Sequence, residues 1–189
     1  MEVRDLILKN RSYRRFYQSH QIELSLLRDL VDLARLSSSA ANLQPLKYLL
    51  STEPARNARI FATLGWAGYL KEWSGPAEGE RPSAYIVMLL DHRISKNPFW
   101  DHGIAAQSIL LGAVEQGLGC CMFGNVNREE LRASLGLDEH LEILQVIAFG
   151  KPKEQVQLVP VGEDGDIRYY RDAKGVHYVP KRSLDDVIL

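Results

Sequence analysis

The stretch Arg11-Ser12-Tyr13-Arg14-Arg15-Phe16 places three guanidinium groups and a serine hydroxyl within six residues, directly after a short amphipathic segment. Each guanidinium is a planar fork that can grip two oxygens of a phosphate, and it stays charged at physiological pH. The stretch therefore suits a phosphate dianion. A basic run of this length is by itself more often a solvated surface, so the rest of the chain has to decide between the two interpretations.

A second polar stretch, Ser37-Ser38-Ser39-Ala40-Ala41-Asn42-Leu43-Gln44-Pro45, predicts a loop that Pro45 closes before an extended run over residues 47–51. The amides of Asn42 and Gln44 can both donate and accept hydrogen bonds, which the alternating carbonyl and N–H edge of a pyrimidine-like ring requires. Asparagine also satisfies backbone groups in ordinary turns. The loop alone leaves both interpretations open.

Composition predicts one soluble domain over residues 1–189, because 46% hydrophobic and 25% charged residues are ordinary for a globular protein. Lysine and arginine total 23 against 24 acidic residues, a net charge of -1, so no global basic field exists to hold nucleic acid or an anionic membrane. The N-terminus has no signal-peptide pattern and no apolar run is long enough to span a bilayer. We therefore expect a cytoplasmic protein.

The cysteines and histidines do not form a recognisable site. Cys120 and Cys121 are adjacent, which fits neither a disulfide framework nor a CxxC pattern, and they are expected to be small buried residues. The five histidines are scattered without metal-ligand spacing. Glycines at 117 and 119 lack the third glycine of a dinucleotide-binding turn, and a helix precedes them where a strand would be needed, so a Rossmann NAD site is disfavoured.

Hydrophobic periodicity predicts a mixture of helices and strands. Helices are expected over residues 3–10, 22–36 with Ser25 as a candidate N-cap, 54–64, 99–117 and 127–135, the last opened by a capping box and ended by Gly136. Strands are expected over 47–51, 83–90, from 119 onwards and 142–149, followed by a hairpin of 167–170 with 176–179. Residues 83–90 are uniformly apolar, which indicates a central strand covered on both faces.

Two further regions allow more than one interpretation. Three large aromatics between residues 65 and 73 could form a lid over a flat ring, but they are more often anchors for a loop. The helix over 99–117 is apolar almost all round, so a homodimer interface is one way to cover it. On this helix His102 and Gln107 are expected to be satisfied core polar residues rather than site residues.

The two polar stretches together resemble the nitroreductase family of flavoproteins, in which a basic R-S-x-R-x-F stretch is followed by S-S-x-x-N-x-Q-P. Here these are residues 11–16 and Ser38 to Pro45. Asp101 to Gln107, Gly117 to Cys121 and Ala148 to Pro152 are similar to the family's central helix, following strand and late Gly-x-Pro turn. The similarity covers most of the chain.

This resemblance implies an α+β fold of three layers, with a central, mostly antiparallel sheet flanked by helices, built as an intertwined homodimer with flavin sites between subunits. It implies FMN as cofactor. The residues expected to hold FMN are Arg11, Ser12 and Arg14 at the phosphate, Ser39, Asn42 and Gln44 at the ring and ribityl chain, the segment Met122, Phe123 and Gly124 near the reactive nitrogen, and Lys181 and Arg182 as a second hold on the phosphate. Arg15 is expected to be solvated.

By the same resemblance, NAD(P)H reduces FMN and leaves, and a nitroaromatic, quinone or related small acceptor then takes its place in a ping-pong cycle. No catalytic side chain is required, because the flavin carries the electron transfer. The sequence leaves open a flavin-binding protein for storage or sensing with little turnover. It also leaves open specialised reactions of related proteins, such as dehalogenation or flavin destruction.

Overall fold

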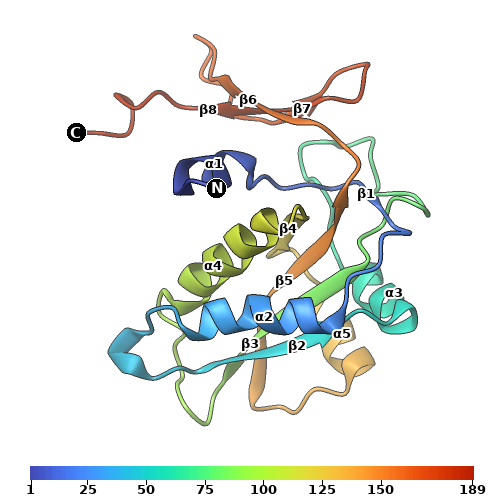
Figure 1. The fold of residues 1–189 in the computed structure, drawn as a ribbon, viewed down its shortest axis with the longest axis vertical. Helices are drawn as coiled ribbons and strands as arrows, with labels where there is room; N and C mark the ends of the chain where they lie inside the picture. Colours follow the sequence, from blue (N-terminus) through green and yellow to red (C-terminus); the bar gives the residue numbers. More distant parts are fainter.

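The computed structural model describes residues 1–189 and is built around an antiparallel sheet of five strands (Figure 1). β3 (Ala84–Asp91) lies between β2 (Leu46–Ser51) and β5 (Leu141–Pro152). β4 (Gly119–Phe123) and the short β1 (Phe16–Tyr17) both pair with β5. Every residue of β3 is buried. The prediction of a central strand covered on both faces is therefore confirmed.

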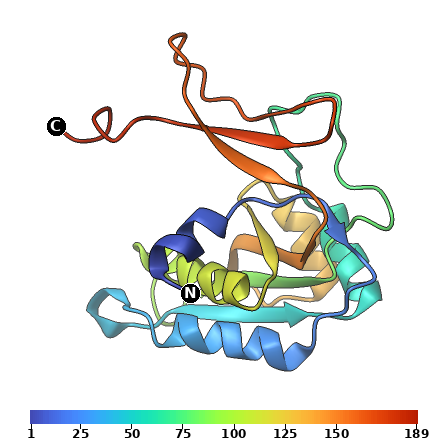
Figure 2. The same cartoon turned by 45° about the horizontal axis from the view of Figure 1, so that its top comes forward.

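Helices cover both faces of this sheet (Figures 1 and 2). On one face α2 (Leu24–Arg35) and α4 (Asp101–Glu115) pack on Ile86 and Met88 of β3, and α1 (Val3–Lys9) lies against α4. On the other face α3 (Pro54–Ala62) and α5 (Arg128–Leu135) pack on Tyr85 and Val87. Successive side chains of a strand point to opposite faces, so β3 supplies both cores. The three-layer α+β prediction is confirmed.

The ends of the helices test the local predictions. Asn127 accepts a hydrogen bond from the backbone N–H of Glu130 at 3.3 Å, and Gly136 adopts the left-handed conformation (φ 63°) that ends α5. These predictions are confirmed. The prediction of Ser25 as N-cap is wrong, because α2 begins at Leu24 with Glu23 as its cap residue and Ser25 lies inside the first turn.

Apolar surface remains uncovered on two helices. α4 is buried along most of its length, but Ile104 is 41% exposed and Trp100, just before the helix, is 80% exposed. α1 has no buried residue; Val3 is 66% exposed and Leu8 is 50% exposed. An apolar face of this kind is suited to association. The homodimer stays a prediction.

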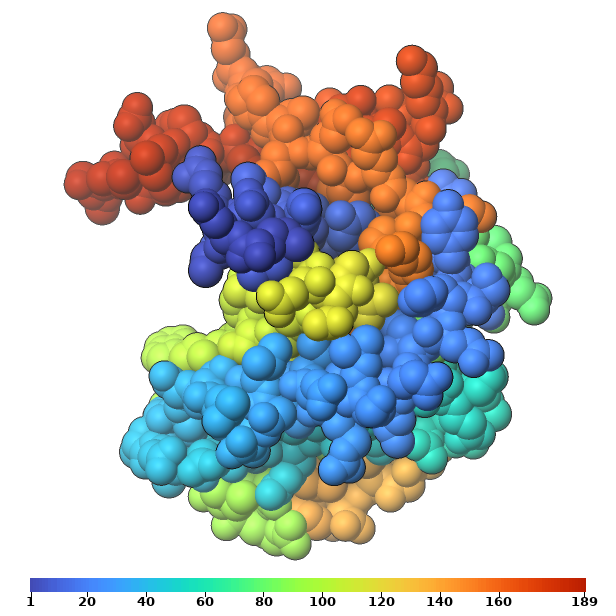
Figure 3. Space-filling view, viewed as in Figure 1, coloured from blue at the N-terminus to red at the C-terminus, as the bar shows by residue number.

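The C-terminal region forms a second, smaller sheet above α1 (Figures 1 and 3). β7 (Tyr170–Arg171) and β8 (His177–Lys181) form the predicted hairpin, and β6 (Val156–Pro160) pairs in parallel with β8, which was not predicted. Beyond β8 the chain extends away from the body of the protein (Figure 3). None of the helices is both long and apolar enough to cross a bilayer.

The aromatic segment after α3 is anchored to the core. The Trp66 ring lies 4.7 Å from that of Phe123 and 5.5 Å from that of Phe61, centroid to centroid, and Trp73 packs edge-on against Trp66 at 6.1 Å. The indoles therefore fix the segment to the face that carries α3 and α5. Of the two interpretations of this segment, the contacts favour anchoring.

Candidate functional site

A cavity of about 310 Å³ opens where the N-terminal stretch, α4, β4 and the C-terminal sheet meet. We call it the cationic cavity. Three of its lining residues are cations and none is acidic. The lining residues are Asn10, Arg11, Ser12, Arg14, Gln107, Leu110, Cys120, Met122, Tyr169, His177, Val179 and Lys181. An uncompensated cluster of positive charge in a concave surface attracts anions.

The N-terminal stretch reaches this cavity because it lies directly on β4. The backbone N–H of Tyr13 donates to the carbonyl of Cys120 at 2.9 Å, and Ser12 forms a parallel bridge with Cys120. A Cβ at Gly119 would come within 2.7 Å of the Tyr13 ring and of Pro152. Only glycine allows so close an approach at this position. The strand therefore sets the positions of Arg11 and Arg14.

Arg14 is buried, with 9% of its surface exposed, and its guanidinium is held from three sides. Nη1 donates to the carbonyl of Ser12 at 3.3 Å and lies 3.1 Å from Nε2 of His177. The guanidinium carbon stands 4.5 Å from the centroid of the Tyr169 ring, a cation–π contact. No carboxylate pairs with this side chain. A buried, oriented cation without an ion-pair partner is suited to an anionic ligand.

Arg11 also has unused donor capacity. Its Nη2 donates to the carbonyl of Ile7 at 2.8 Å, while Nε is buried without an acceptor. Burial lowers the pKa of Arg11, although Tyr13 acts in the opposite direction. A bound anion would supply the missing acceptor and offset the cost of burying the charge.

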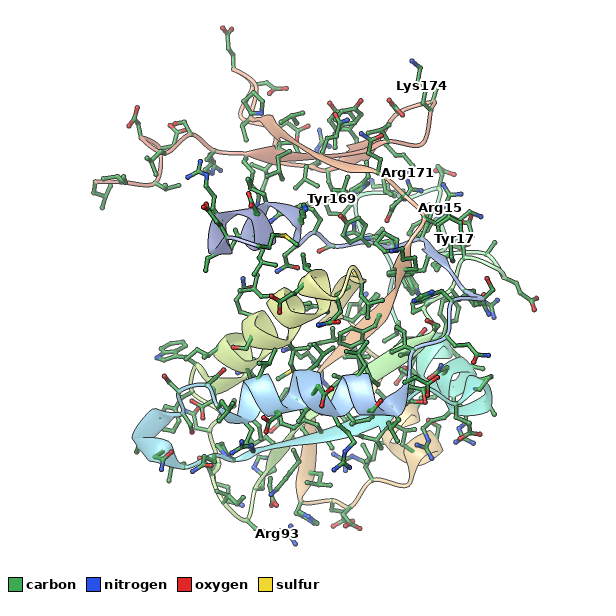
Figure 4. The ribbon with its side chains drawn as sticks, in the orientation of Figure 1. Arg15, Tyr17, Arg93, Tyr169, Arg171 and Lys174 are labelled. Atoms are coloured by element: carbon green, nitrogen blue, oxygen red, sulfur yellow. The ribbon has the colours of Figure 1, made fainter.

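A buried carboxylate supports the stretch from behind. Glu154, whose side chain is 1% exposed, accepts hydrogen bonds from the backbone N–H groups of Arg14 and Arg15 and from Nη2 of Arg171 at 2.8 Å. The Arg171 guanidinium in turn lies 4.9 Å from the Trp73 ring centroid. Figure 4 shows Tyr169 and Arg171 between the C-terminal sheet and the N-terminal segment. Glu154 therefore neutralises Arg171, and the cavity keeps its charge.

The prediction that Arg15 is solvated is wrong. Its Nε and Nη2 donate to the two oxygens of Glu80 at 2.6 and 2.5 Å, and Lys153 lies 2.9 Å from the same carboxylate. These cations lower the pKa of Glu80 to about 2. Arg15 therefore ties the N-terminal stretch to the segment before β3 and does not line the cationic cavity.

Sequence reasoning missed His177, which lies at the start of β8 and is fully buried. Burial, followed by the nearby Arg14 and Arg171, lowers its pKa to about 4. The ring is therefore neutral near pH 7, and Nε2 can accept from Arg14. Gln107 was expected to be a core residue but is exposed and lines the cavity. His177 and Arg14 are 163 positions apart, so no local pattern could have paired them.

Of the remaining candidates from β4 and the C-terminus, some line the cationic cavity and others do not. Met122 is 47% exposed and lines the cavity, while Phe123 is buried on the opposite face and Gly124 follows the strand. Strand alternation explains this division. Lys181 lines the cavity, and its neighbour Arg182 does not. Cys120 and Cys121 are free and buried, as predicted.

Residues 37–45, which we call the amide loop, lie elsewhere. Ser39 Oγ donates to Asp101 at 2.5 Å and accepts from the backbone N–H of Gln44, so this hydroxyl is occupied within the loop. Asn42 and Gln44 are exposed and bond to each other at 3.1 Å. Together with Ala41 they have positive φ angles of 48° to 55°, which are unfavourable for L-residues.

The amide loop and the cationic cavity are separate within one chain. No residue of the amide loop lines the cationic cavity. A separate cavity of about 220 Å³ lies beside the loop, and Arg11, Arg14 and Lys181 are not among its lining residues. In Figure 1 the loop lies beyond the C-terminal end of α2, whereas the N-terminal stretch lies beside β4. A single chain therefore does not bring the two predicted halves of the site together.

Residues 80–151 match the model of the nitroreductase family. The resemblance to the nitroreductase family is confirmed. A provisionally named NADH dehydrogenase/NAD(P)H nitroreductase of Archaeoglobus fulgidus is 28% identical over 162 residues, covering 82% of this chain and 87% of that protein. The chain is therefore similar, over most of its length, to a relative that is named as an oxidoreductase.

Solved structures agree on the fold. A nitroreductase family protein of Streptococcus pneumoniae superposes with a TM-score of 0.72 at 14% identity, covering 100% of this chain and 99% of that one. An FMN-dependent nitroreductase of Clostridium difficile superposes with a TM-score of 0.63 at 22% identity, covering 78% and 87%. At these identities the similarity establishes that the chain has the nitroreductase fold.

Proposed function

We propose that this protein is an FMN-dependent oxidoreductase that uses NAD(P)H to reduce nitroaromatics, quinones or related small acceptors by a ping-pong mechanism. The observation that carries the proposal is the cationic cavity, where Arg11, Arg14 and Lys181 converge without any acidic residue. Three cations suit the dianionic phosphate of a mononucleotide. The FMN-dependent relative of the same fold supports the choice of flavin.

The residues of the cavity fit the phosphate end of FMN. Arg11 Nε is a buried donor without an acceptor, and Arg14 is a buried cation without a carboxylate partner. Lys181, the last residue of β8, also lines the cavity. Its positive charge is carried on a flexible side chain, which can adjust to the position of the phosphate. We assign Arg11, Ser12, Arg14 and Lys181 to the phosphate. Arg182, which does not line the cavity, is left out of this assignment.

When bound, FMN would supply hydride and electron transfer between NAD(P)H and the acceptor. The chain would contribute binding and orientation. Met122 gives the cavity an apolar wall, and Gln107 a polar group that can donate or accept. The backbone N–H groups between Cys121 and Gly124 are the candidate donors to the ring's reactive nitrogen.

The ring edge presents a row of alternating donors and acceptors, and the amide loop carries exposed amides on Asn42 and Gln44 that can pair with such a row. We propose that a second copy of the chain supplies this loop, so that each site is completed across a homodimer. The uncovered apolar residues of α1 and α4 support such an interface. Conformational strain in a loop of this kind is often associated with a functional role.

The proposal is tested by the visible spectrum of the purified protein, before and after incubation with FMN. A flavin spectrum that survives gel filtration is expected. Loss of NADH or NADPH absorbance on adding a nitroaromatic or quinone acceptor would then establish turnover. Protein that retains no flavin contradicts the proposal. Flavin binding without turnover of any common acceptor would instead identify a storage or sensing protein.

A further inference from the structure

A second cavity, of about 380 Å³, lies where the segment before α2, one side of α3 and the start of β3 meet. It shares no lining residue with the cationic cavity. Its volume is at the lower end of the range for small-molecule pockets. Its lining is mostly polar and includes a single cation, Arg81, so we call it the Arg81 pocket.

The guanidinium of Arg81 has no acidic partner. Its Nε is buried without an acceptor, whereas the guanidiniums of Arg15, Arg93 and Arg171 each lie within 2.8 Å of a carboxylate oxygen. The Arg81 guanidinium carbon stands 4.6 Å from the centroid of the Phe61 ring. Its backbone N–H donates to Oε1 of Gln18 at 3.2 Å. The side chain is therefore held in place while its donors remain unused.

A second unused donor lies two residues further along the chain. The hydroxyl of Ser83 is buried and has no hydrogen-bond partner. The neighbouring amide of Asn57 is engaged with other groups, because its Oδ1 accepts from Ser51 at 2.7 Å and its Nδ2 donates to the carbonyl of Ser83 at 2.7 Å. Leaving buried donors unpaired is costly, and an acceptor group that entered the pocket and reached these two donors would remove that cost.

We propose that the Arg81 pocket binds a small monocarboxylate, with the carboxylate on the Arg81 fork and the Ser83 hydroxyl. A guanidinium fork matches the two oxygens of a carboxylate. A phosphate dianion is less suitable, because Arg81 is the only lining cation and the exposed carboxylate of Glu23 stands among the lining residues. Ile22, Pro54, Ala58 and Pro82 give the pocket an apolar part for a short hydrocarbon body. This site does not depend on the proposed flavin chemistry.

The test is titration of the full-length protein with benzoate, acetate and inorganic phosphate, followed by amide chemical shifts in NMR spectra. Benzoate is expected to bind saturably and to shift amides of the pocket, such as Gln18 and Phe61, with phosphate binding more weakly. Arg81→Gln should weaken benzoate binding at least about tenfold, and Ser83→Ala about threefold, because a charged pair contributes more than a neutral hydrogen bond. Arg59→Gln, an exposed arginine on the same helix as Phe61, is the matched control and should bind as wild type.

Arg81→Lys separates binding from folding, because it keeps the charge but loses the planar fork. Intermediate benzoate affinity in this variant, with an unchanged melting temperature, supports the proposal. The proposal is overturned if benzoate does not saturate, if phosphate binds more tightly than benzoate, or if Arg81→Gln and Arg59→Gln bind equally well.

Discussion

The cationic cavity and the amide loop differ in how their residues are held. Arg14 is fixed by partners from distant parts of the chain, namely Glu154 on its backbone and Tyr169 and His177 on its side chain. The amide loop is anchored at its start to α4, where Asp101 accepts from Ser39 and from the backbone N–H of Ala40, but the side chains of Asn42 and Gln44 bond only within the loop. The cavity is therefore complete within one chain, while the loop presents exposed amides to solvent. This difference is expected if the cavity of one subunit and the amide loop of another subunit together form one binding site.

A site shared between subunits is tested most directly by placing a mutation of the cationic cavity in one subunit and a mutation of the amide loop in the other. One subunit would carry Arg14→Ala and the other Asn42→Ala with Gln44→Ala, separated by two affinity tags. If the site is shared, each pure variant is inactive, while the mixed dimer has one site with both defects and one intact site. NAD(P)H oxidation by the purified mixed dimer should then approach half the wild-type rate. Mixed dimers as inactive as the pure variants would place the whole site in one chain.

The comparison also shows what the sequence could and could not predict. Periodicity predicted β3 and α4, and the capping-box and glycine patterns predicted the caps of α5, because all of these depend on neighbours within a few residues. The two ligand stretches were recognised from residue type and order. Glu154, His177 and the Arg15–Glu80 pair were not predicted, because each contact joins segments that are more than 60 positions apart. Ser25 was assigned as a cap because sequence alone does not fix the first residue of a helix.

The next prediction distinguishes phosphate binding from ring binding. Arg14→Ala should weaken FMN by about 100-fold, equal to about 2.7 kcal/mol, because it removes a charge-assisted contact from a buried site. Affinity for riboflavin, which lacks the phosphate, should stay unchanged. Fluorescence titration of both flavins measures the effect. Arg128→Ala is the control, because its guanidinium donates only to backbone carbonyls such as that of Ile143. Equal losses for FMN and riboflavin would show that Arg14 acts through folding.

Acid should destabilise the region of the cationic cavity through His177. Its pKa is about 4 in the folded protein against an ordinary value of 6.5, so between these values the unfolded chain binds a proton that the folded chain excludes. The contribution is fully present above pH 6.5 and is lost as the pH falls towards 4, by at most about 3 kcal/mol. Urea unfolding of wild type and His177→Gln across this range should show a shallower pH dependence for the variant. Parallel curves would contradict the assignment.

The two adjacent C-terminal cations provide a matched pair. Lys181 lines the cationic cavity and Arg182 does not, although both are exposed. Lys181→Ala should weaken FMN about tenfold, equal to about 1.4 kcal/mol, because one charge near the phosphate is lost. Arg182→Ala changes the net charge equally and should bind FMN as wild type. A larger loss for Arg182→Ala would mean that the tail docks differently when the ligand is bound.

The smallest effect concerns strain in the amide loop. Ala41 has φ 48° and ψ 21°, a left-handed conformation that costs an alanine about 1–2 kcal/mol, whereas glycine adopts it freely. Ala41→Gly should therefore stabilise the chain by about 0.5 kcal/mol, after allowing for the greater entropy of glycine in the unfolded state. Ala40→Gly, the neighbouring control without a positive φ, should instead destabilise it by about 0.5 kcal/mol. The melting temperatures of both variants measure these changes. A lower melting temperature in both would mean that Ala41 does not keep the left-handed conformation in solution.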